Sequence, residues 1–380
     1  MIYITMKQSP KYEQLSIEDF LFEMTKPQGQ VIMHETTDTR TYKVHTVSEH
    51  FTKYFDIVGI IDKLAEFNRT YDKLRAVPRH DLYHTFHIPK KSGGLRQIDA
   101  PNDELMDALR CLKTIFENDC RALYHTSAFA YIKGRSTIAA VKRHQVNNSQ
   151  WFGKYDLSNF FGSTTLDFVL KMFGMVYPFS DIVKSQRGKE ELSKALELAF
   201  LDGGLPQGTP ISPLITNIMM IPIDFELTKK FRDSEQNFVN TRYADDFIIS
   251  SKQGFSFREV EKWIVDTLSS FGAPFTINSK KTRYGSRAGR NWNLGVMLNQ
   301  DNKITVGHQK KRKFQAMISS YIMDKKNGKS WDLNDVQIMM GYLNYFKMVE
   351  GDEPIDGMIN HIGEKFGVNV MQLIKDDLRA

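Results

Sequence analysis

Cysteine is almost absent from this chain of 380 residues, which contains only Cys111 and Cys120. Two such positions cannot build a disulfide framework or a cysteine-based zinc site. Long apolar runs are missing as well: no stretch approaches the roughly 20 residues that cross a bilayer, and the N-terminus does not read as a signal peptide. These absences predict a protein of the reducing cytoplasm that does not associate with a membrane.

Repeats, low-complexity linkers and long polar tails are also missing, so a chain of this length is expected to bury a large core across two or three lobes. The charge is only modestly unbalanced, with 51 Lys and Arg against 45 Asp and Glu, a net +6 and a pI near 9.0. The basic residues that are present cluster at 280–290 and 310–313. Such clusters suit phosphate backbones, although a solvated face would have the same composition.

Two adjacent carboxylates, Asp245 and Asp246, lie at the tip of a predicted β-hairpin after Tyr243 and Ala244. β-rich runs at 238–243 and 247–249 flank them. Adjacent carboxylates at a tight turn repel each other unless a cation lies between them, and carboxylate oxygens are ligands that Mg²⁺ prefers. The tetrapeptide alone favours a solvated turn, whereas the rest of the chain favours a metal site.

A third carboxylate, Asp156, lies near the end of a predicted strand over 151–157. Two divalent ions need about three shared carboxylates, with other ligands from phosphates, water and backbone oxygen. Asp156 and Asp245 would bridge the ions and Asp246 would support them. Leu157 would lend its carbonyl oxygen. The alternative is that Asp156 caps a turn before Ser158.

Glycines and prolines interleave in a third segment, 203–213, which predicts a stiff loop of special shape. Ser212 followed by Pro213 predicts a helix start, with the hydroxyl at the N-cap and proline at N1. The apolar run 214–221 would continue that helix. Elsewhere, helices are predicted at 16–24, 51–75, 103–116 and 190–201, and β-like alternation is predicted at 30–47. A loop of this kind can lie close to a template base or a nucleotide, although an ordinary connection explains the glycines alone.

Taken in order, these motifs resemble those of reverse transcriptases of the bacterial retron, group II intron and defence-associated kind. Each motif alone is weak, and the specificity lies in the ordered series over roughly residues 80–350. The matching segments are 87–101, 128–144 with Lys133-Gly134-Arg135-Ser136, Asp156 to Phe161, Leu205-Pro206-Gln207-Gly208 with Ser212-Pro213, Tyr243 to Asp246, 278–282, Asn293-Leu294-Gly295 and Gly341 to Tyr345.

The resemblance implies an α+β right-hand polymerase that has a palm sheet with helices, fingers, and a helical C-terminal thumb. It divides the chain into an N-terminal extension at 1–80, a fingers and palm core at 81–308 and a thumb at 309–380. The extension would bind an RNA or a partner, or would brace the fingers, and bracing is slightly favoured. The implied cofactor is Mg²⁺, as two ions, with Mn²⁺ able to substitute.

Several side chains gain roles from the same resemblance. Arg96, helped by Lys90 or Lys91, would bind the incoming triphosphate. Lys281 would protonate the leaving pyrophosphate, or would contact the nucleic-acid backbone. Phe161 would stack beneath the sugar and select deoxynucleotides, or would simply pack in the core. Further nucleotide contacts are expected from Gln207 and Gly208, and nucleic-acid contacts from Leu294, Gly295, Lys310, Lys311, Arg312 and Lys313.

The implied function is an RNA-directed DNA polymerase that extends a 3′-hydroxyl with dNTPs, copying an RNA template into a DNA product. Two departures from the retron pattern, Ala140-Val141 for an Asn-Ala pair and Asn293-Leu294-Gly295 for Val-Thr-Gly, favour a compact defence-associated enzyme that acts against phage with a dedicated non-coding RNA. The alternatives are a retron enzyme that makes RNA-linked DNA, protein-primed or template-independent synthesis, and an RNA-binding effector with a vestigial site. A homo-oligomer or a partner protein is compatible with each of them.

Overall fold

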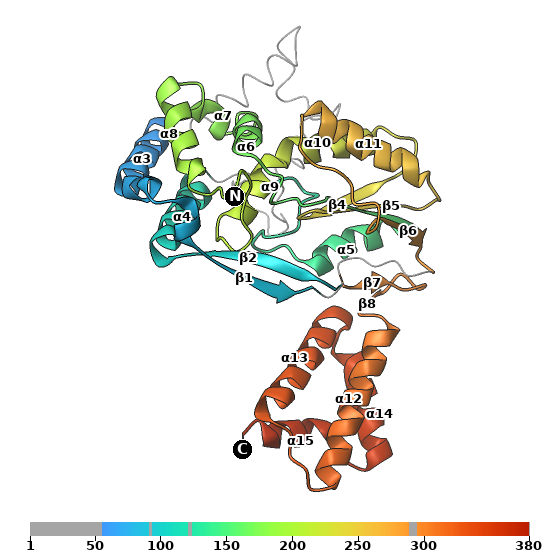
Figure 1. The fold of residues 1–380 in the computed structure, drawn as a ribbon. Coiled ribbons are helices and arrows are strands. Elements are labelled where there is room, and N and C mark those ends of the chain that lie inside the picture. Colours follow the sequence, from blue (N-terminus) through green and yellow to red (C-terminus); the bar gives the residue numbers. More distant parts are fainter. Residues whose placement is uncertain (1–54, 91–92, 121–123, 289–294, 380) are drawn as a thin grey trace, which may run out of the picture.

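A computed structural model describes residues 55–90, 93–120, 124–288 and 295–379 (Figure 1). The helix predicted at 16–24, the β-like segment at 30–47, and the site candidates Lys91 and Leu294 lie outside the described residues. The described part is α+β, as predicted, with many helices and small antiparallel sheets. No helix in those ranges combines the length and the apolar character needed to cross a membrane.

A four-stranded antiparallel sheet with the strand order β4-β5-β3-β6 carries the carboxylates. β3 lies inside the sheet because it pairs with β5 on one side and with β6 on the other. The strands predicted at 151–157, 238–243 and 247–249 are confirmed to within two residues. Their bounds are Trp151–Asp156 for β3, Val239–Tyr243 for β4, Asp246–Ser251 for β5 and Arg283–Ser286 for β6.

Helices cover both faces of this sheet, with α10 (Ile221–Arg232) and α11 (Phe257–Ser270) on one face and α5 (Thr137–Val146) on the other (Figure 1). His144 of α5 is fully buried and forms hydrogen bonds with Ser250 Oγ at 2.6 Å and Thr241 Oγ1 at 2.8 Å. Burial lowers the pKa of His144 to about 3, so the ring is neutral at physiological pH. A polar cluster therefore fastens α5 to β4 and β5.

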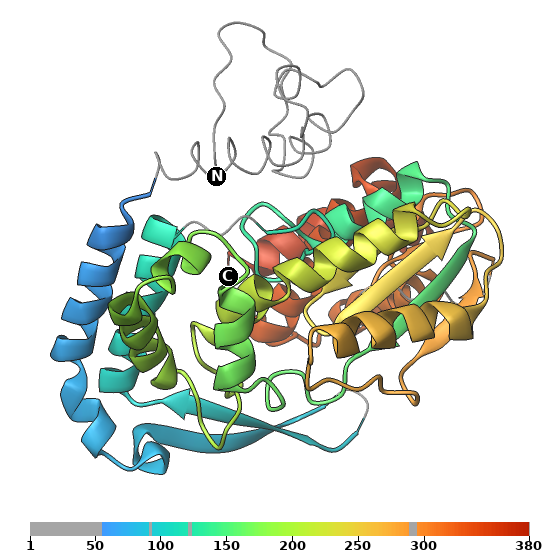
Figure 2. The same cartoon turned by 90° about the horizontal axis from the view of Figure 1, so that it is seen from above.

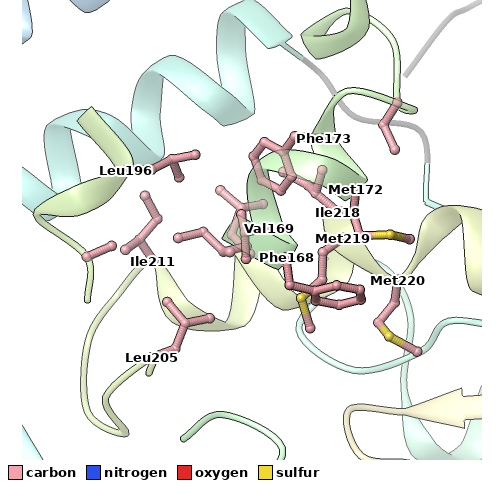
Figure 3. Packing of buried hydrophobic residues seen from close by; sticks show 14 of the residues in the cluster. Phe168, Val169, Met172, Phe173, Leu196, Leu205, Ile211, Ile218, Met219 and Met220 are labelled. Carbon is pink, nitrogen blue, oxygen red and sulfur yellow. The ribbon is translucent and has the colours of Figure 1, made fainter. Parts of the chain in front are cut away.

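A second lobe lies at the opposite end of the molecule from the β4–β5 hairpin (Figure 2). It contains the hairpin of β1 and β2 and a group of helices whose apolar faces form the main core. Figure 3 shows this core between α6, α8 and α9, with rings such as Phe168 and Phe173 packed against Ile218 and Met219. The bounds are α3 Ile57–Thr70, β1 Tyr83–Pro89, β2 Leu95–Pro101, α4 Asp103–Ile115, α6 Leu166–Phe173, α7 Phe179–Ile182, α8 Gln186–Glu197 and α9 Ser212–Met219, with short turns η2 Asp72–Ala76, η3 Arg79–Leu82 and η4 Phe116–Cys120.

Two helix starts differ from the sequence prediction. Ser212 is the first residue of α9 rather than its N-cap, which is Ile211, and the Ser212 N–H donates to Thr209 Oγ1 at 3.2 Å. The helix predicted at 190–201 is α8, which begins four residues earlier because the side chain of Ser185 accepts the Gly188 N–H at 3.0 Å. The helix predicted at 103–116 is confirmed as α4. Within the predicted helical run 51–75, α3 packs against α4, α7 and α8, which supports bracing.

The C-terminal lobe is helical and lies below the sheet in the view of Figure 1. Its core joins the small hairpin of β7 and β8 and continues to Phe152 and Ile248 in the large sheet, so the lobe is attached by apolar packing as well as by the chain. Its first helix begins at His308, one residue before the predicted boundary. The bounds are β7 Met297–Leu298, β8 Ile304–Thr305, α12 His308–Lys326, α13 Leu333–Glu350, α14 Asp352–Phe366 and α15 Val370–Asp377.

Candidate active site

The sheet brings the three predicted carboxylates together. Asp156 is the last residue of β3, and its register partner is Asp246, the first residue of β5. Asp245 lies in the tight turn between β4 and β5, and its carbonyl oxygen accepts the Leu157 N–H at 3.0 Å. Strand pairing therefore makes neighbours of carboxylates that are 90 residues apart in the sequence, from 156 to 246.

Two lysines offset part of this negative charge. Lys281 Nζ lies 3.0 Å from Asp156 Oδ1 and 3.1 Å from Oδ2, and only the Oδ2 contact has hydrogen-bond geometry. Lys154 Nζ donates to Asp246 Oδ2 at 2.7 Å. Lys154 was missed by the sequence analysis, although its position two residues before Asp156 on a strand places both side chains on the same face.

Burial opposes full ionisation of the paired aspartates. Burial raises the pKa of Asp245 to about 6, and the neighbouring charge of Asp246 adds to the rise. Burial also raises the pKa of Asp246, but Lys154 opposes that rise through its charge and its hydrogen bond. A divalent cation would relieve this repulsion, because it would favour the charged form of every carboxylate that it touches.

The donor set fits divalent cations. Asp246 Oδ1 is buried without a hydrogen-bond partner, so an oxygen is left over for a further ligand. Within the described ranges, no three Asp, Glu, His or Cys side chains are already spaced as a closed metal site. Instead, Lys154 forms an ion pair with Asp246, and Lys281 forms one with Asp156. A bound cation would therefore replace lysine contacts.

The predicted nucleotide loop packs against the β1–β2 hairpin. Asp99 N–H in β2 donates to Gln207 O at 2.8 Å. Gly208 is exposed and has a φ of 124°, and a Cβ there would meet Asp99 O and Ile98 Cγ2 at 2.9 Å. Glycine is thus required at 208 by both conformation and space. The loop therefore fixes the hairpin that carries Arg96 relative to the rest of the site.

Phe160 and Phe161, which are adjacent in sequence, differ in burial. Phe160 is 3% exposed and packs on Phe275 with ring centroids 5.0 Å apart, so it is a core residue. Phe161 is only partly buried, and its carbonyl oxygen accepts the Leu205 N–H at 2.9 Å. Phe161 is thus the ring with exposed surface beside the glycine-rich loop, where a sugar gate is expected.

The hairpin cations are exposed. Lys90 N–H donates to Gly94 O at 2.9 Å and closes the tip of the hairpin, and Lys90 and Arg96 are exposed.

Tyr131, which sequence reasoning did not single out, lies close enough to Asp245 and Arg96 to feel their charges. Partial burial raises its pKa, the charge of Asp245 adds to the rise, and Arg96 opposes it. Its φ of 59°, unusual for a tyrosine, was invisible in the sequence.

The basic run at the start of α12 splits into two pairs. Lys310 Nζ donates to Gly295 O, and Lys311 Nζ donates to Glu350 Oε2 at 2.5 Å. Arg312 and Lys313 are exposed. The first pair therefore fastens α12 to neighbouring elements, and the second pair is the one displayed to solvent.

Comparison with known proteins places this geometry in a family. The family model described as reverse transcriptase (RNA-dependent DNA polymerase) matches residues 88–316, which is 229 of the 380 residues. The retron Ec83 reverse transcriptase of Escherichia coli is 27% identical over 306 residues, covering 77% of this chain and 89% of that protein. The retron Ec73 reverse transcriptase of the same species is 28% identical, covering 69% and 82%.

The solved structure of telomerase from Candida albicans with a telomeric RNA fragment is 12% identical over 74% of this chain and 61% of that one, with a TM-score of 0.44, which is too low to inform the fold. The similarity to these relatives supports the retron type. In the sequence analysis, the departures from the retron pattern at Ala140-Val141 and 293–295 favoured a defence-associated enzyme instead. Because the family match covers more than half of its length, the chain belongs to the reverse transcriptase family and is an RNA-directed DNA polymerase.

Proposed function

We propose that the chain extends a 3′-hydroxyl with dNTPs by two-metal phosphoryl transfer, with Asp156, Asp245 and Asp246 holding two Mg²⁺ ions that Mn²⁺ can replace. The observation that carries the proposal is the cluster of three carboxylates, with Asp156 buried, Asp245 and Asp246 partly buried, and Asp246 Oδ1 left unpaired. When bound, the ions would activate the attacking hydroxyl and neutralise charge on the leaving pyrophosphate. Leu157 would contribute its carbonyl oxygen.

The surrounding residues would then act on the nucleotide. Lys281 is 57% exposed and already reaches Asp156, so its ammonium can lie beside the leaving pyrophosphate and give it a proton. Arg96 would pair with triphosphate oxygens through its planar fork, helped by Lys90 or Lys91. Phe161 would lie under the sugar, with Gln207 and Gly208 lining the nucleotide side.

The mechanism predicts that Asp156→Asn, Asp245→Asn and Asp246→Asn each lower the incorporation of labelled dNTP on a primed RNA by at least about 100-fold, because each removes one charged ligand. The exposed Asp266→Asn is the matched control and should leave incorporation unchanged. Thermal unfolding would establish that each variant is folded. Wild-type rates in a folded Asp245→Asn would remove the metal assignment.

We also propose that the template is a dedicated non-coding RNA and that the DNA product serves anti-phage defence. The proposal rests on analogy with the bacterial families that the motifs resemble. A retron enzyme, which joins RNA to its DNA product, is the second candidate, and the names of the Escherichia coli relatives favour it. The domain limits 1–80, 81–308 and 309–380 are part of the same proposal.

Sequencing of nucleic acid that co-purifies with the protein would test the template. One discrete RNA with complementary DNA is expected, whereas a random sample of cellular RNA would contradict a dedicated template. RNase treatment separates the two candidates, because it changes the mobility of DNA that is joined to RNA and leaves unlinked DNA unchanged. Phage plating on cells with the wild type and with Asp245→Asn would test defence, and equal plating would contradict it.

A further inference from the structure

Arg242 lies at the centre of a buried polar cluster beside the catalytic turn. It belongs to β4, two residues before Ala244, and its side chain is 1% exposed. Its Nε and Nη2 donate to the two carboxylate oxygens of Asp224 in α10 at 2.8 and 2.7 Å. Asp224 is equally buried; burial raises its pKa, and the charge and hydrogen bonds of Arg242 oppose the rise. Removal of either partner would leave an uncompensated buried charge.

The third guanidinium nitrogen of Arg242 holds the catalytic turn. Nη1 donates to Ala244 O at 3.1 Å and lies 3.4 Å from Asn217 Oδ1. Ala244 has a φ of 56°, which is costly for a residue with a Cβ, and it directly precedes Asp245. The hydrogen bond thus stabilises the strained backbone that aims Asp245 toward Asp156.

Asn217 carries the cluster to a second strained residue. Its Nδ2 donates to Ala130 O at 2.7 Å, and the next residue, Tyr131, has a φ of 59° and is 57% exposed. The same cluster therefore holds the carbonyl that precedes Asp245 and the carbonyl that precedes Tyr131. One buried polar cluster thus connects the turn that carries Asp245 with the segment that carries the exposed ring of Tyr131.

The main chain of Arg242 makes the same connection. Its N–H donates to Ser127 O at 2.6 Å, and its carbonyl oxygen accepts the Phe129 N–H at 2.8 Å. These bonds form a parallel bridge to Ala128. The segment 127–131 is thus joined to the catalytic hairpin by backbone as well as by side chains.

We propose that Arg242, with Asp224 and Asn217, is a positioning residue of the polymerase, which fixes the turn carrying Asp245 against the segment carrying Tyr131. A buried ion pair is weak evidence for stability, because packed apolar residues often stabilise as well. Here, however, two polar arms of the cluster end on the carbonyls that precede Asp245 and Tyr131. The inference rests on the proposed metal role of Asp245, since it states how that ligand is held in place.

The test compares Arg242→Lys with a control from the other buried polar cluster on these strands. Arg242→Lys keeps a positive charge beside Asp224 but cannot reach both Asp224 and Ala244 O. Ser250 lies four residues further along β5 than Asp246, and Ser250→Ala removes its hydrogen bonds with His144 and Ser149. Three quantities are measured for each: thermal unfolding, binding of Mn²⁺ followed by the EPR signal of the free ion, and kcat and KM for dNTP addition.

A positioning role predicts that Arg242→Lys weakens Mn²⁺ binding about 10–100-fold and lowers kcat about 100-fold. Ser250→Ala should lose comparable thermal stability with neither change. Equal losses of stability, with Mn²⁺ affinity unchanged in both, would reduce Arg242 to a structural role and overturn the inference.

A second variant keeps the test decisive if Arg242→Lys does not fold. Asn217→Ala leaves the ion pair and the bond to Ala244 O intact; it removes the bond to Ala130 O and the long 3.4 Å contact with Arg242 Nη1. It should lower kcat and raise KM for dNTP with Mn²⁺ affinity little changed, because it frees the Tyr131 segment alone. Unchanged kcat and KM would contradict the proposal. A wild type that binds no Mn²⁺ would instead refute the proposed metal site.

Discussion

At the scale of single residues, the site combines negative and positive side chains that are partly shielded from solvent. The three carboxylates lie beside the ammonium groups of Lys154 and Lys281. Burial raises the pKa of Asp245 to about 6. At neutral pH these partly buried carboxylates therefore carry an unfavourable electrostatic free energy, which a nearby cation would lower.

This balance predicts an unusual pH dependence of stability. The folded pKa of Asp245, about 6, is above the ordinary 3.8, so the folded state binds the proton more tightly. The free energy of unfolding in EDTA should therefore rise as pH falls through 6 toward 4, by at most about 3 kcal/mol from this group. Asp245→Asn should remove that part of the dependence, and denaturant titrations at pH 7.5 and 5.0 measure it. Identical pH profiles for both proteins would argue against the burial of this charge.

A second residue-scale prediction concerns the choice of sugar. Phe161→Ala should lower the ratio of kcat/KM for dNTP over ribonucleotide by about 10–100-fold, because the vacated ring leaves room for a 2′-hydroxyl. Phe160→Leu is the control: it alters the buried ring and should cost stability while keeping the ratio. If Phe160→Leu shifts the ratio and Phe161→Ala does not, the gate lies at Phe160.

At the scale of elements, the loop 203–211 joins the β1–β2 hairpin to the segment that follows β3, through the main chains of Gln207 and Leu205. Gly208→Ala should raise KM for dNTP and lower stability by about 1–3 kcal/mol, because its Cβ would lie 2.9 Å from Asp99 O. Gly203→Ala is a matched control, since its φ of 78° is also positive but its Cβ would meet nothing within 4 Å. Pre-steady-state dNTP titration of both variants measures the difference. Equal effects would mean that backbone strain, and not contact with β2, matters.

At the scale of the whole molecule, the thumb should grip the template–primer through Arg312 and Lys313. Arg312→Gln with Lys313→Gln should flatten the slope of log affinity against log salt by about 0.7–0.9 per lost phosphate contact. Lys310→Gln with Lys311→Gln should mainly lower thermal stability, because those side chains already bind Gly295 O and Glu350. Binding titrations at several salt concentrations decide the matter, and the reverse outcome would move the contact to the first pair.

Much of this molecule could be predicted from local pattern. The alternation in β3, β4 and β5, the amphipathic spacing of α4 and the Asp-Asp turn are local features, and they predicted these elements and the turn between β4 and β5. The order of motifs supplied the family and hence the α+β class.

The features that the sequence did not predict depend on tertiary contacts. Ser212 lies inside α9 rather than at its N-cap, and its N–H and hydroxyl both bond to Thr209 Oγ1, three residues earlier. Lys154, Tyr131 and Arg242 have roles that depend on which distant carbonyl or carboxylate lies beside them, and sequence spacing does not state this. The contacts of Lys310 with Gly295 O and of Lys311 with Glu350 were not predicted for the same reason, because a run of basic residues alone indicates a solvent-exposed face.

The place of β3 inside the sheet has a consequence for how the chain is made. Its partners β5 and β6 begin at Asp246 and Arg283, so the ribosome must add 90 residues after Asp156 before the first partner starts to appear. At about 5–20 residues per second, β3 waits on the order of 5–20 s with both edges unpaired. During synthesis the central strand is thus an exposed, aromatic segment that helices or a chaperone must cover, and the catalytic centre forms late in the life of the nascent chain.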